Sequence, residues 1–335
     1  MATYNGQQHI RRQLDSIAAQ SHAPAELVIT DDRSEDDTIA IIDAFAKTAS
    51  FPVNVFHNET RLAYRANFMR AASLCQSELI AFCDQDDYWY PLKIEMSIKP
   101  FSDPDVLLAY HNADVVTDDG RRIGSLAARA AQQFILTPMS SGPWPLALGF
   151  TEVFRRSLLR LSDLWPNSHD FYESAQLSPH DQWFFFLAAA FGKIAYLDEP
   201  LAAYVQHGSN TYGWRKMGVG ERVKDICRNR SNEYSHYAKA AESRAVILDT
   251  ATDGLEGIWR ERATVAAEYY RKFSWLCAGR SMLYTSTNLS DRLKAFRGIL
   301  VKGGYTGTWS FGRRACIVDL CLGVPIGPLL RSNAV

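Results

Sequence analysis

Short apolar segments that end in acidic residues alternate with segments of helical periodicity over the first part of the chain. The strand-like segments are 27–30, 53–56 and 79–83, and the helix-like segments are 7–20, 39–45 and 68–74. Two of the strand-like segments run directly into carboxylates, at Asp31 and at Asp84. Helices and strands that alternate in this way predict a mostly parallel sheet covered by helices, and therefore an α/β fold.

Polar residues at helix starts, and further periodic segments, extend this interpretation along the chain. Asn5 is placed to cap the first helix, and Ser34 with Asp37 resembles a capping box for the second. Later patterns predict helices at 91–98, 153–161 and 181–191, and strands at 106–110, 113–117, 195–197 and 202–205. Strand signals end near residue 215. We therefore expect a domain at 1–214 and a basic, mainly helical region at 215–335.

The beginning of the sequence is short for such a fold. A parallel α/β sheet normally begins with a strand, yet only Met1 to Thr3 precede the first loop and helix. Either the first strand is reduced to these residues, or the natural chain starts earlier.

Charge is balanced over the whole chain but not along it. Lys and Arg number 36 against 37 Asp and Glu, which argues against a general nucleic-acid-binding protein. Residues 1–210 hold 16 basic and 26 acidic side chains, a net −10, and residues 211–335 hold the other 20 basic and 11 acidic, a net +9. An acidic first part and a basic tail indicate separate roles.

The cysteines and the apolar segments bear on the compartment. The six cysteines include no Cys-x-x-Cys pair, and a chain of 335 residues needs no disulfides to build a core, so we interpret them as reduced and the protein as cytoplasmic. The first residues lack the basic and apolar regions of a signal peptide. The apolar stretch 315–330 is shorter than the roughly 18 residues of a spanning helix, so it is expected to lie on a membrane rather than cross one.

Carboxylates gather where two predicted strands end, at 31–32 and at 84–87. The carboxyl ends of parallel strands are where α/β sheets bind ligands, so these acids are expected to share one cleft. Acids in one cleft repel one another unless a cation lies among them. Their oxygen atoms suit Mg²⁺ and Mn²⁺, which usually bridge a few carboxylates to substrate phosphates. The ordinary alternative is that each acidic pair is a solvated turn or a helix cap.

Several motifs occur in order along residues 1–210. They are Ala2-Thr3-Tyr4-Asn5-Gly6, Asp31-Asp32-Arg33-Ser34 followed by Asp36, Asp84-Gln85-Asp86-Asp87-Tyr88-Trp89 with Pro91, Gly149 to Arg156, Pro179-His180-Asp181-Gln182-Trp183, and Tyr204 to Asn210. Their order and spacing resemble family 2 inverting nucleotide-sugar glycosyltransferases, and the last three motifs resemble bacterial rhamnosyltransferase-type members. The resemblance implies a GT-A sheet flanked by helices, with a C-terminal helical extension. It also implies transfer of a sugar such as rhamnose from a dTDP- or UDP-sugar to a saccharide acceptor in bacterial surface polysaccharide synthesis.

The resemblance implies donor-binding roles for residues near the strand ends. Ala2 and Tyr4 would lie by the nucleotide base, and Asp32 would accept a hydrogen bond from a pyrimidine ring N–H. Asp84 would contact the ribose. Arg65, which follows a predicted strand, is a candidate for contact with the diphosphate, against the common alternative of a surface arginine.

The resemblance also implies a metal and a base. Asp86 would hold Mn²⁺ or Mg²⁺ on the diphosphate, and His207 would contact the metal or the diphosphate, unless it is only structural. Asp181 matches the base that removes a proton from the acceptor hydroxyl, although an Asp at a helix start is often only a cap. His180 would orient Asp181 or merely pack. Asp87 would contact the metal or cap the following turn.

Three other functions compete with a metal-dependent, inverting glycosyltransferase. An Asp-x-Asp phosphohydrolase is disfavoured because Tyr88 and Trp89 follow the motif where that chemistry usually has Thr or Val. A dinucleotide-binding oxidoreductase is disfavoured because no Gly-x-Gly-x-x-Gly opens the first helix. A non-catalytic nucleotide-binding protein of the same fold stays open.

The basic, partly apolar tail bears on the partners. Enzymes of this kind that build polymers often act on acceptors carried by lipid diphosphate, so the tail would bring the cleft to the anionic inner face of the cell membrane. We expect peripheral, salt-sensitive contact through the C-terminal region. The alternative of equal weight is that these helices pack on the catalytic domain or form a homodimer contact.

Overall fold

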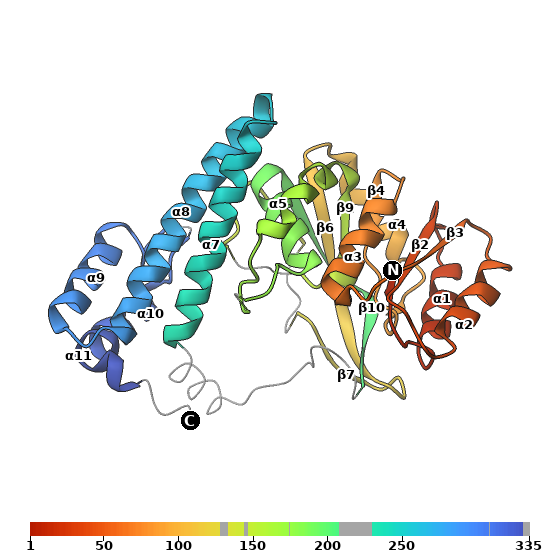
Figure 1. Ribbon diagram of the computed structural model, residues 1–335, viewed down its shortest axis with the longest axis horizontal. Coiled ribbons are helices and arrows are strands. Elements are labelled where there is room, and N and C mark those ends of the chain that lie inside the picture. Colours follow the sequence, from red (N-terminus) through yellow and green to blue (C-terminus); the bar gives the residue numbers. More distant parts are fainter. Residues whose placement is uncertain (128–132, 144–146, 174, 208–229, 308, 331–335) are drawn as a thin grey trace. The chain divides into compact units, whose positions relative to one another are not determined.

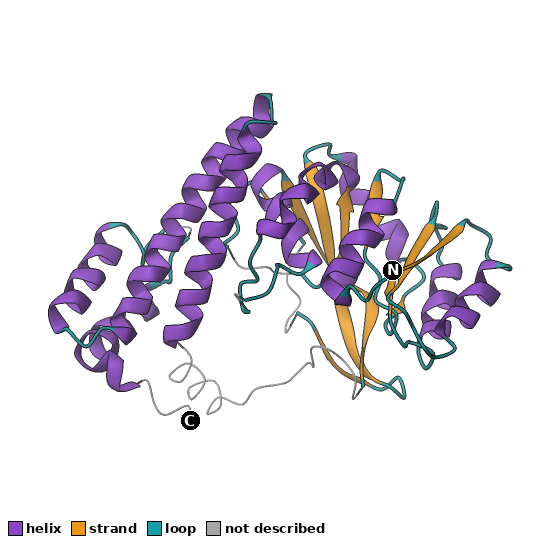
Figure 2. Ribbon diagram, viewed as in Figure 1, coloured by secondary structure: helices purple, strands orange, loops and turns teal. Residues whose placement is uncertain are grey.

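The computed structural model describes residues 1–127, 133–143, 147–173, 175–207, 230–307 and 309–330. The chain forms two compact units. The first consists of 1–138, 145–163 and 179–214, and the second of 139–144, 164–178 and 215–335. Figure 1 follows the chain in colour through its elements, and Figure 2 shows strands in the first unit and a set of helices after residue 230.

The first sheet has three parallel strands in the order β1, β2, β3, which are Ala2–Thr3, Leu27–Asp31 and Val53–His57. Helices α1 (Ile10–Ala18), α2 (Thr38–Ala46) and α3 (Ala63–Leu74) follow the three strands in turn. The apolar faces of α1 and α2 are buried in one core with the side chains of β2, which explains their helical spacing in the sequence. The amino group of Met1 donates to the carbonyl of Val28 at 2.8 Å.

The second sheet is mixed, with strands in the order β4, β9, β6, β10, β5, and with β7 on β6 and β8 on β10. The strands are β4 (Leu79–Ala81), β5 (Tyr88–Trp89), β6 (Val106–Thr117), β7 (Arg122–Ser125), β8 (Phe134–Leu136), β9 (Glu152–Arg155) and β10 (Lys193–Gln206). The long strands β6 and β10 run parallel, and the other pairs are antiparallel. The α/β class with flanking helices is confirmed, and the antiparallel strands add to it.

Helix α5 (His180–Phe191) fixes one face of the second sheet. The helix is apolar almost all round and almost completely buried, as expected for a helix covered on every side. The ring of Phe184 stacks on Phe154 of β9 with centroids 4.1 Å apart, and Phe185 packs against Tyr110 of β6. The short helix α4 (Lys93–Ile98) precedes β6. This packing fixes the start of α5, where His180 and Asp181 stand.

The helix predicted at 153–161 is wrong in its first part. Residues 152–155 form β9, which pairs with both β4 and β6, and a 3₁₀ helix, η3 (Arg156–Asn167), follows it. The apolar residues Val153 and Phe154 fit either pattern. The segment forms a strand because it pairs with both β4 and β6, which buries its successive side chains on the two faces of the sheet.

The predicted helix caps are also wrong. Asn5 has a positive φ of 46° and accepts from the backbone N–H of Glu35, while α1 starts at Ile10. Ser34 donates to Asp31, and no side chain caps α2 at Asp37. These polar residues bond to the loop between β2 and α2 instead, since short polar side chains bond readily to nearby turns. The two pairs of short strands predicted at 106–117 and 195–205 are single strands, β6 and β10.

The second unit is helical after residue 230. Its helices are α7 (Arg230–Thr252), α8 (Gly257–Thr285), α9 (Leu289–Val301), α10 (Arg313–Val318) and α11 (Val324–Ile326), with a π-helical turn η4 (Asp319–Gly323) and a 3₁₀ turn η5 (Gly327–Leu330). The long helices α7 and α8 pack along each other (Figure 1). The predicted C-terminal helical extension is confirmed. None of the helices in the described ranges has the length and apolarity needed to pass through a membrane.

A buried ionic network holds the end of the second unit. Asp319 accepts hydrogen bonds from Arg280 Nε at 2.6 Å and Nη2 at 3.1 Å, from the Tyr284 hydroxyl at 2.6 Å and from the Tyr305 hydroxyl at 2.9 Å. Both Arg280 and Asp319 are buried. The network therefore fixes η4 against α8 and compensates the buried charges.

Candidate active site

Asp32 lies at the end of β2 and is bonded to the loop that follows β3. Its Oδ1 accepts from the Asn58 side chain at 2.8 Å and from the Leu62 N–H at 2.6 Å, and its Oδ2 accepts from the Ala63 N–H at 2.8 Å. Ala63 has a positive φ of 61°, so this carboxylate holds a strained turn. A carboxylate offers about four acceptor positions. Three of these are used by bonds within the described part of the chain, which leaves one on Oδ2.

The end of β1 is joined to the loop that follows β4 by one side chain. Gln85 accepts from the Tyr4 N–H at 2.9 Å and donates to the Tyr4 carbonyl at 3.0 Å. Gly6 permits this approach, because a Cβ there would lie 2.6 Å from the Gln85 Cδ. The guanidinium of Arg61 stacks on the Tyr4 ring at 3.9 Å, and Ala2 is buried in β1. The predicted base-binding residues Ala2 and Tyr4 thus lie beside the motif that contains Asp84.

Carboxylates from the β4 end and from α5 lie close together, and we call Asp84, Asp86, Asp87 and Asp181 the acidic cluster. Burial, followed by the charges of Asp86 and Asp181, raises the pKa of Asp84 to about 7. The pKa of Asp87 is also raised, by burial and by Asp84 and Asp86. Burial and the neighbouring carboxylates both disfavour the ionised forms, and a cation or a positively charged group would oppose this effect.

Asp87 bonds within the protein. Its Oδ1 accepts from the Val205 N–H at 3.2 Å, which connects the motif to the end of β10, and its side chain is buried. The sequence pattern fits either a turn cap or a metal contact for Asp87. The bond to β10 favours a structural role.

Asp86 and His207 form a pair at the edge of the acidic cluster. Oδ2 of Asp86 lies 3.0 Å from Nε2 of His207, and the ring of His9 stacks on that of His207 with centroids 4.4 Å apart. The structure therefore brings the two predicted metal ligands together. No group of three or more His, Cys, Asp or Glu suited to a metal occurs among the residues that the structure describes. A cation here would take its other ligands from a substrate or from water.

Asp181 stands in the first turn of α5 and is half-buried. Its Oδ1 accepts from the N–H of Gln182 at 2.7 Å, and the N-cap position belongs to Pro179. Asp181 is therefore not the cap that the simplest interpretation expected. Its charge contributes to the raised pKa values of both Asp84 and Glu152.

His180 is packed rather than solvated. Its ring stacks on Phe68 at 3.9 Å and meets the edge of Phe82 at 4.5 Å. Burial, together with the charge of Arg65, lowers the pKa of His180 to about 3, so the ring is neutral. Arg65 of α3 accordingly lies near the start of α5, and its guanidinium also lies over the Tyr64 ring at 4.8 Å.

Sequence reasoning missed three residues of this region: Gln85, Lys93 and Glu152. Lys93 is fully buried, donates to the Phe150 carbonyl at 2.6 Å, contacts Nε2 of His111 and lies over the Trp89 ring. Burial lowers its pKa to about 7. The sequence feature that could have indicated a buried Lys93 is its position two residues after Pro91 in an amphipathic segment.

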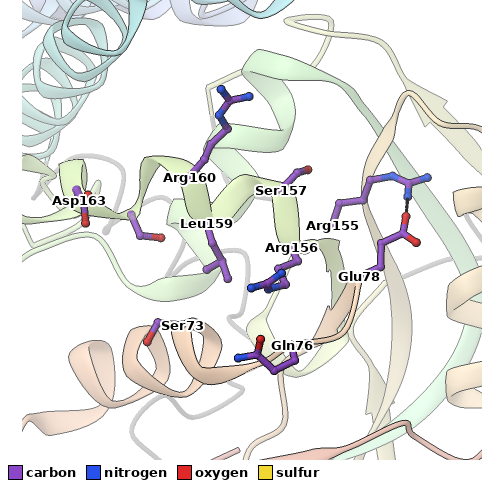
Figure 3. Close-up of a pocket in the computed structure, with 10 residues that line it drawn as sticks. Ser73, Gln76, Glu78, Arg155, Arg156, Ser157, Leu159, Arg160 and Asp163 are labelled. Atoms are coloured by element: carbon purple, nitrogen blue, oxygen red, sulfur yellow. Dashed lines mark hydrogen bonds and ion pairs between the residues drawn. The ribbon is translucent and has the colours of Figure 1, made fainter. Parts of the chain in front are cut away.

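A large pocket in the first unit lies away from these residues (Figure 3). It has a volume of about 810 Å³ and is lined by Gln76 and Glu78, which precede β4, and by Arg155, Arg156 and Arg160. The acidic cluster follows β4 instead. The pocket is therefore at the opposite end of β4 and contains none of the predicted site residues.

Comparison with known proteins identifies the class. Residues 1–161 match the family described as Glycosyl transferase family 2. This match covers the first part of the chain and agrees with the family and the GT-A fold that the motifs predicted.

Relatives and a solved structure agree with this class. The uncharacterized protein Rv1520 of Mycobacterium tuberculosis is 29% identical over 210 residues, which are 61% of this chain and 57% of that protein. The match thus spans less than two thirds of that relative's length. The dTDP-rhamnosyl transferase RfbG of Shigella flexneri is 28% identical over 226 residues, 64% of this chain and 73% of that protein. S. aureus TarS 1-349 in complex with UDP-GlcNAc has the same fold, with a TM-score of 0.53, 16% identity, and coverage of 90% of this chain and 78% of that chain.

Proposed function

We propose that this protein is an inverting glycosyltransferase in which Asp181 is the general base. The observation that carries the proposal is the position of Asp181 in the first turn of α5, where its charge acts on Asp84, whereas Asp86 pairs with His207. Inversion needs one carboxylate on the acceptor side, separate from the group that faces the diphosphate. Asp181 would take the proton of the acceptor hydroxyl while that oxygen bonds to the anomeric carbon and the nucleotide diphosphate departs with the electron pair.

The proposed donor is a dTDP- or UDP-sugar. The remaining acceptor position of Asp32 suits the ring N–H of thymine or uracil, and a hollow of about 340 Å³ lined by residues 57–60, Leu62 and Arg70 lies at the loop that Asp32 holds. Tyr4 and Ala2 would border the base, Asp84 the ribose and Arg65 the diphosphate. The name of the Shigella relative supports rhamnose as the sugar.

The proposed cofactor is Mn²⁺ or Mg²⁺, held by Asp86 and His207. The residues fit such an ion, because these cations commonly use one or two protein carboxylates and complete their coordination with substrate phosphates and water. Burial and the charges of Asp86 and Asp181 raise the pKa of Asp84, and a bound cation would oppose this effect. When bound, the ion would offset the charge that grows on the departing diphosphate.

Asp181→Asn tests the base. We expect donor binding to persist and transfer from dTDP-rhamnose to lipid-linked saccharides to fall on the order of 10² or more, since general-base catalysis typically supplies about 10²–10⁴. Asp43→Asn, an exposed change on α2, is the matched control. Transfer near the wild-type rate in Asp181→Asn would show that another residue is the base.

Asp86→Ala tests the metal. Titration calorimetry with dTDP, with and without Mn²⁺, should show that the variant has lost the metal-dependent part of the affinity while its melting temperature is unchanged. Unchanged metal-dependent affinity would refute the assignment. His207→Ala should lose a smaller part, because the carboxylate carries the charge.

We further propose that the acceptor is a saccharide or lipid-linked saccharide of bacterial surface polysaccharide synthesis, and that the protein meets it on the cytoplasmic side of the membrane. Leu289, Leu293 and Leu300 lie on one face of α9 with about half of each side chain exposed, at 49%, 50% and 51%. Lys294 and Arg297 flank this face and are exposed. An exposed apolar stripe with cations beside it suits an anionic lipid surface.

Sedimentation with phosphatidylglycerol vesicles tests this contact. Each Lys or Arg near such a surface contributes about 1 kcal/mol, so Lys294→Gln with Arg297→Gln should weaken binding by about 2 kcal/mol, roughly 30-fold. Leu293→Ser with Leu300→Ser should also weaken it. Val246→Ser with Val265→Ser removes equally exposed apolar side chains from α7 and α8 and is the control. Wild-type protein that stays in the supernatant at low salt would exclude the membrane contact and leave packing or dimerisation as the role of these helices.

A further inference from the structure

Glu152 is a buried carboxyl group without a hydrogen-bond partner. Its side chain has no exposed surface, and neither of its carboxyl oxygens bonds to any residue in the described part of the chain. Buried polar groups in proteins are nearly always paired, so an unpaired carboxyl requires an explanation. Nothing in the proposed function uses it.

The position of Glu152 is fixed by three strands and a helix. Glu152 lies directly opposite Tyr110 in the antiparallel pair of β9 and β6, and its carbonyl accepts from the N–H of Phe82, two residues before Asp84. Phe154 lies two residues further along β9 and therefore on the same face, where it stacks on Phe184 of α5. The side chain of Glu152 is thus on the face that α5 covers.

The same geometry brings Glu152 to Asp181. Asp181 precedes Phe184 by one helical turn and lies on the same side of α5. Burial, followed by the charge of Asp181, raises the pKa of Glu152. The other titratable groups that face this region are His180, whose ring is neutral, and Tyr110, whose pKa is raised by burial and, in part, by Glu152.

We propose that Glu152 is a positioning residue of the transfer reaction, which forms a carboxyl pair with Asp181 and keeps the one proton that the pair holds at working pH. This inference rests on Asp181 as the base. Two carboxyls in a poorly solvated site do not both ionise readily, and the proton stays with the more buried one. The half-buried partner, Asp181, is then the carboxylate that accepts the proton of the acceptor.

One proton changes its place in the proposed transfer step. The acceptor O–H bond breaks and its proton goes to Asp181, while the bond from the anomeric carbon to the diphosphate oxygen breaks and the new glycosidic bond forms. Glu152 keeps its proton throughout. At high pH Glu152 loses that proton, and the second negative charge repels the anionic donor. Ionisation of Glu152 therefore determines the pH above which kcat/KM falls, which is the alkaline limb of the pH profile.

Glu152→Gln tests the inference, because the amide has the same shape and no proton to lose. At neutral pH kcat/KM for transfer from dTDP-rhamnose should fall no more than about tenfold. The alkaline limb of its pH profile should move up by at least one unit or disappear. Glu78 pairs with Arg155 at the opposite end of β4, so Glu78→Gln should keep the wild-type profile. A Glu152→Gln profile with an unmoved alkaline limb would overturn the inference.

Stability against pH gives a readout that needs no acceptor. A carboxyl with a raised pKa in the folded state makes the protein less stable as pH rises from its unfolded value near 4.5 to its folded value. Glu152→Gln should lack this decline. Asp181→Asn keeps Glu152 but removes the neighbouring charge, so the decline should end at a lower pH. If Glu152→Gln does not fold, identical pH dependence of melting in wild type and Asp181→Asn overturns the inference.

The two proposals fail differently. An active Asp181→Asn variant removes the proposed base and this inference with it. An inactive Asp181→Asn variant together with a wild-type profile in Glu152→Gln removes only the carboxyl pair.

Discussion

Gly149→Ala measures how tightly the start of α5 is fixed. Gly149 begins the 3₁₀ turn η2 (Gly149–Thr151), and its φ is not in the left-handed region, so Ala can adopt its backbone conformation. The obstacle is the His180 ring. A Cβ at residue 149 would lie 3.2 Å from His180 Cδ2 and closer still to Nε2, inside the distance that real Cβ atoms keep.

The His180 ring has little room to move away. Phe68 stacks on one side of it at 3.9 Å and the edge contact with Phe82 is at 4.5 Å, so either the turn or the first turn of α5 must shift. Overpacking of this kind costs about 1–3 kcal/mol, which for a unit of this size lowers the melting temperature by about 2–12 °C. Asp181 follows His180 directly. A displacement of about 1 Å at a catalytic group can lower the rate about 100-fold.

A double-mutant cycle with His180→Ala isolates the contact. Thermal melting and transfer rates are measured for wild type, both single variants and the double variant. In the His180→Ala background the added methyl group has space, so Gly149→Ala should cost almost nothing there, and the coupling energy should equal most of its cost in wild type. If Gly149→Ala costs the same in both backgrounds, the clash is not the cause and the reasoning is wrong.

Three other changes probe the two units. Asp319→Ala should lower the free energy of unfolding by about 3–5 kcal/mol in urea melts, because it leaves the Arg280 charge buried and uncompensated, and Asp319→Asn should restore only part of this. The pKa of Lys93 is about 7 in the fold against 10.5 unfolded, so unfolding takes up a proton between these values and wild-type stability should rise with pH across that window. Lys93→Met should lack that rise in melts taken at several pH values. Gly6→Ala should displace the flexible end of Gln85, weakening dTDP binding about tenfold in calorimetry with little change in melting temperature, and unaltered binding would contradict a role for the Gln85 bridge.

The local patterns of the sequence predicted most of the first unit. Strands β2 and β3 and helix α5 lie within a few residues of their predicted bounds, because each has a run of apolar residues that only one structure buries well. That the acids at the ends of β2 and β4 share one cleft stays a prediction, whereas the two predicted metal ligands, Asp86 and His207, do form a pair. The caps predicted at Asn5 and Ser34 are wrong, because the Asn5 side chain accepts from Glu35 and Ser34 Oγ bonds to Asp31 and to the Asn5 N–H.

The residues that sequence reasoning missed depend on distant partners. Gln85 bonds to Tyr4, 81 positions away, and Lys93 bonds to Phe150, 57 positions away. Glu152 directly precedes the segment 153–161 that was predicted as a helix, and no strand was predicted at this point of the chain. Only the pairing of β9 between β4 and β6 places its carboxyl beneath α5. No local pattern contains that information.

The division of the chain between its units limits how the protein can be cut. The chain passes between the units at 138/139, 144/145, 163/164, 178/179 and 214/215. In the second unit, Trp309 donates to the Met139 carbonyl, Arg244 to that of Pro143, and Ser243 to that of Asn167. A fragment that stops at residue 214 therefore keeps two insertions whose packing partners have been removed, and apolar side chains such as Phe171 would face solvent and promote aggregation. Any chimaera that exchanges the C-terminal helices must carry 139–144 and 164–178 with them, because the second unit is built from three separate segments of the chain.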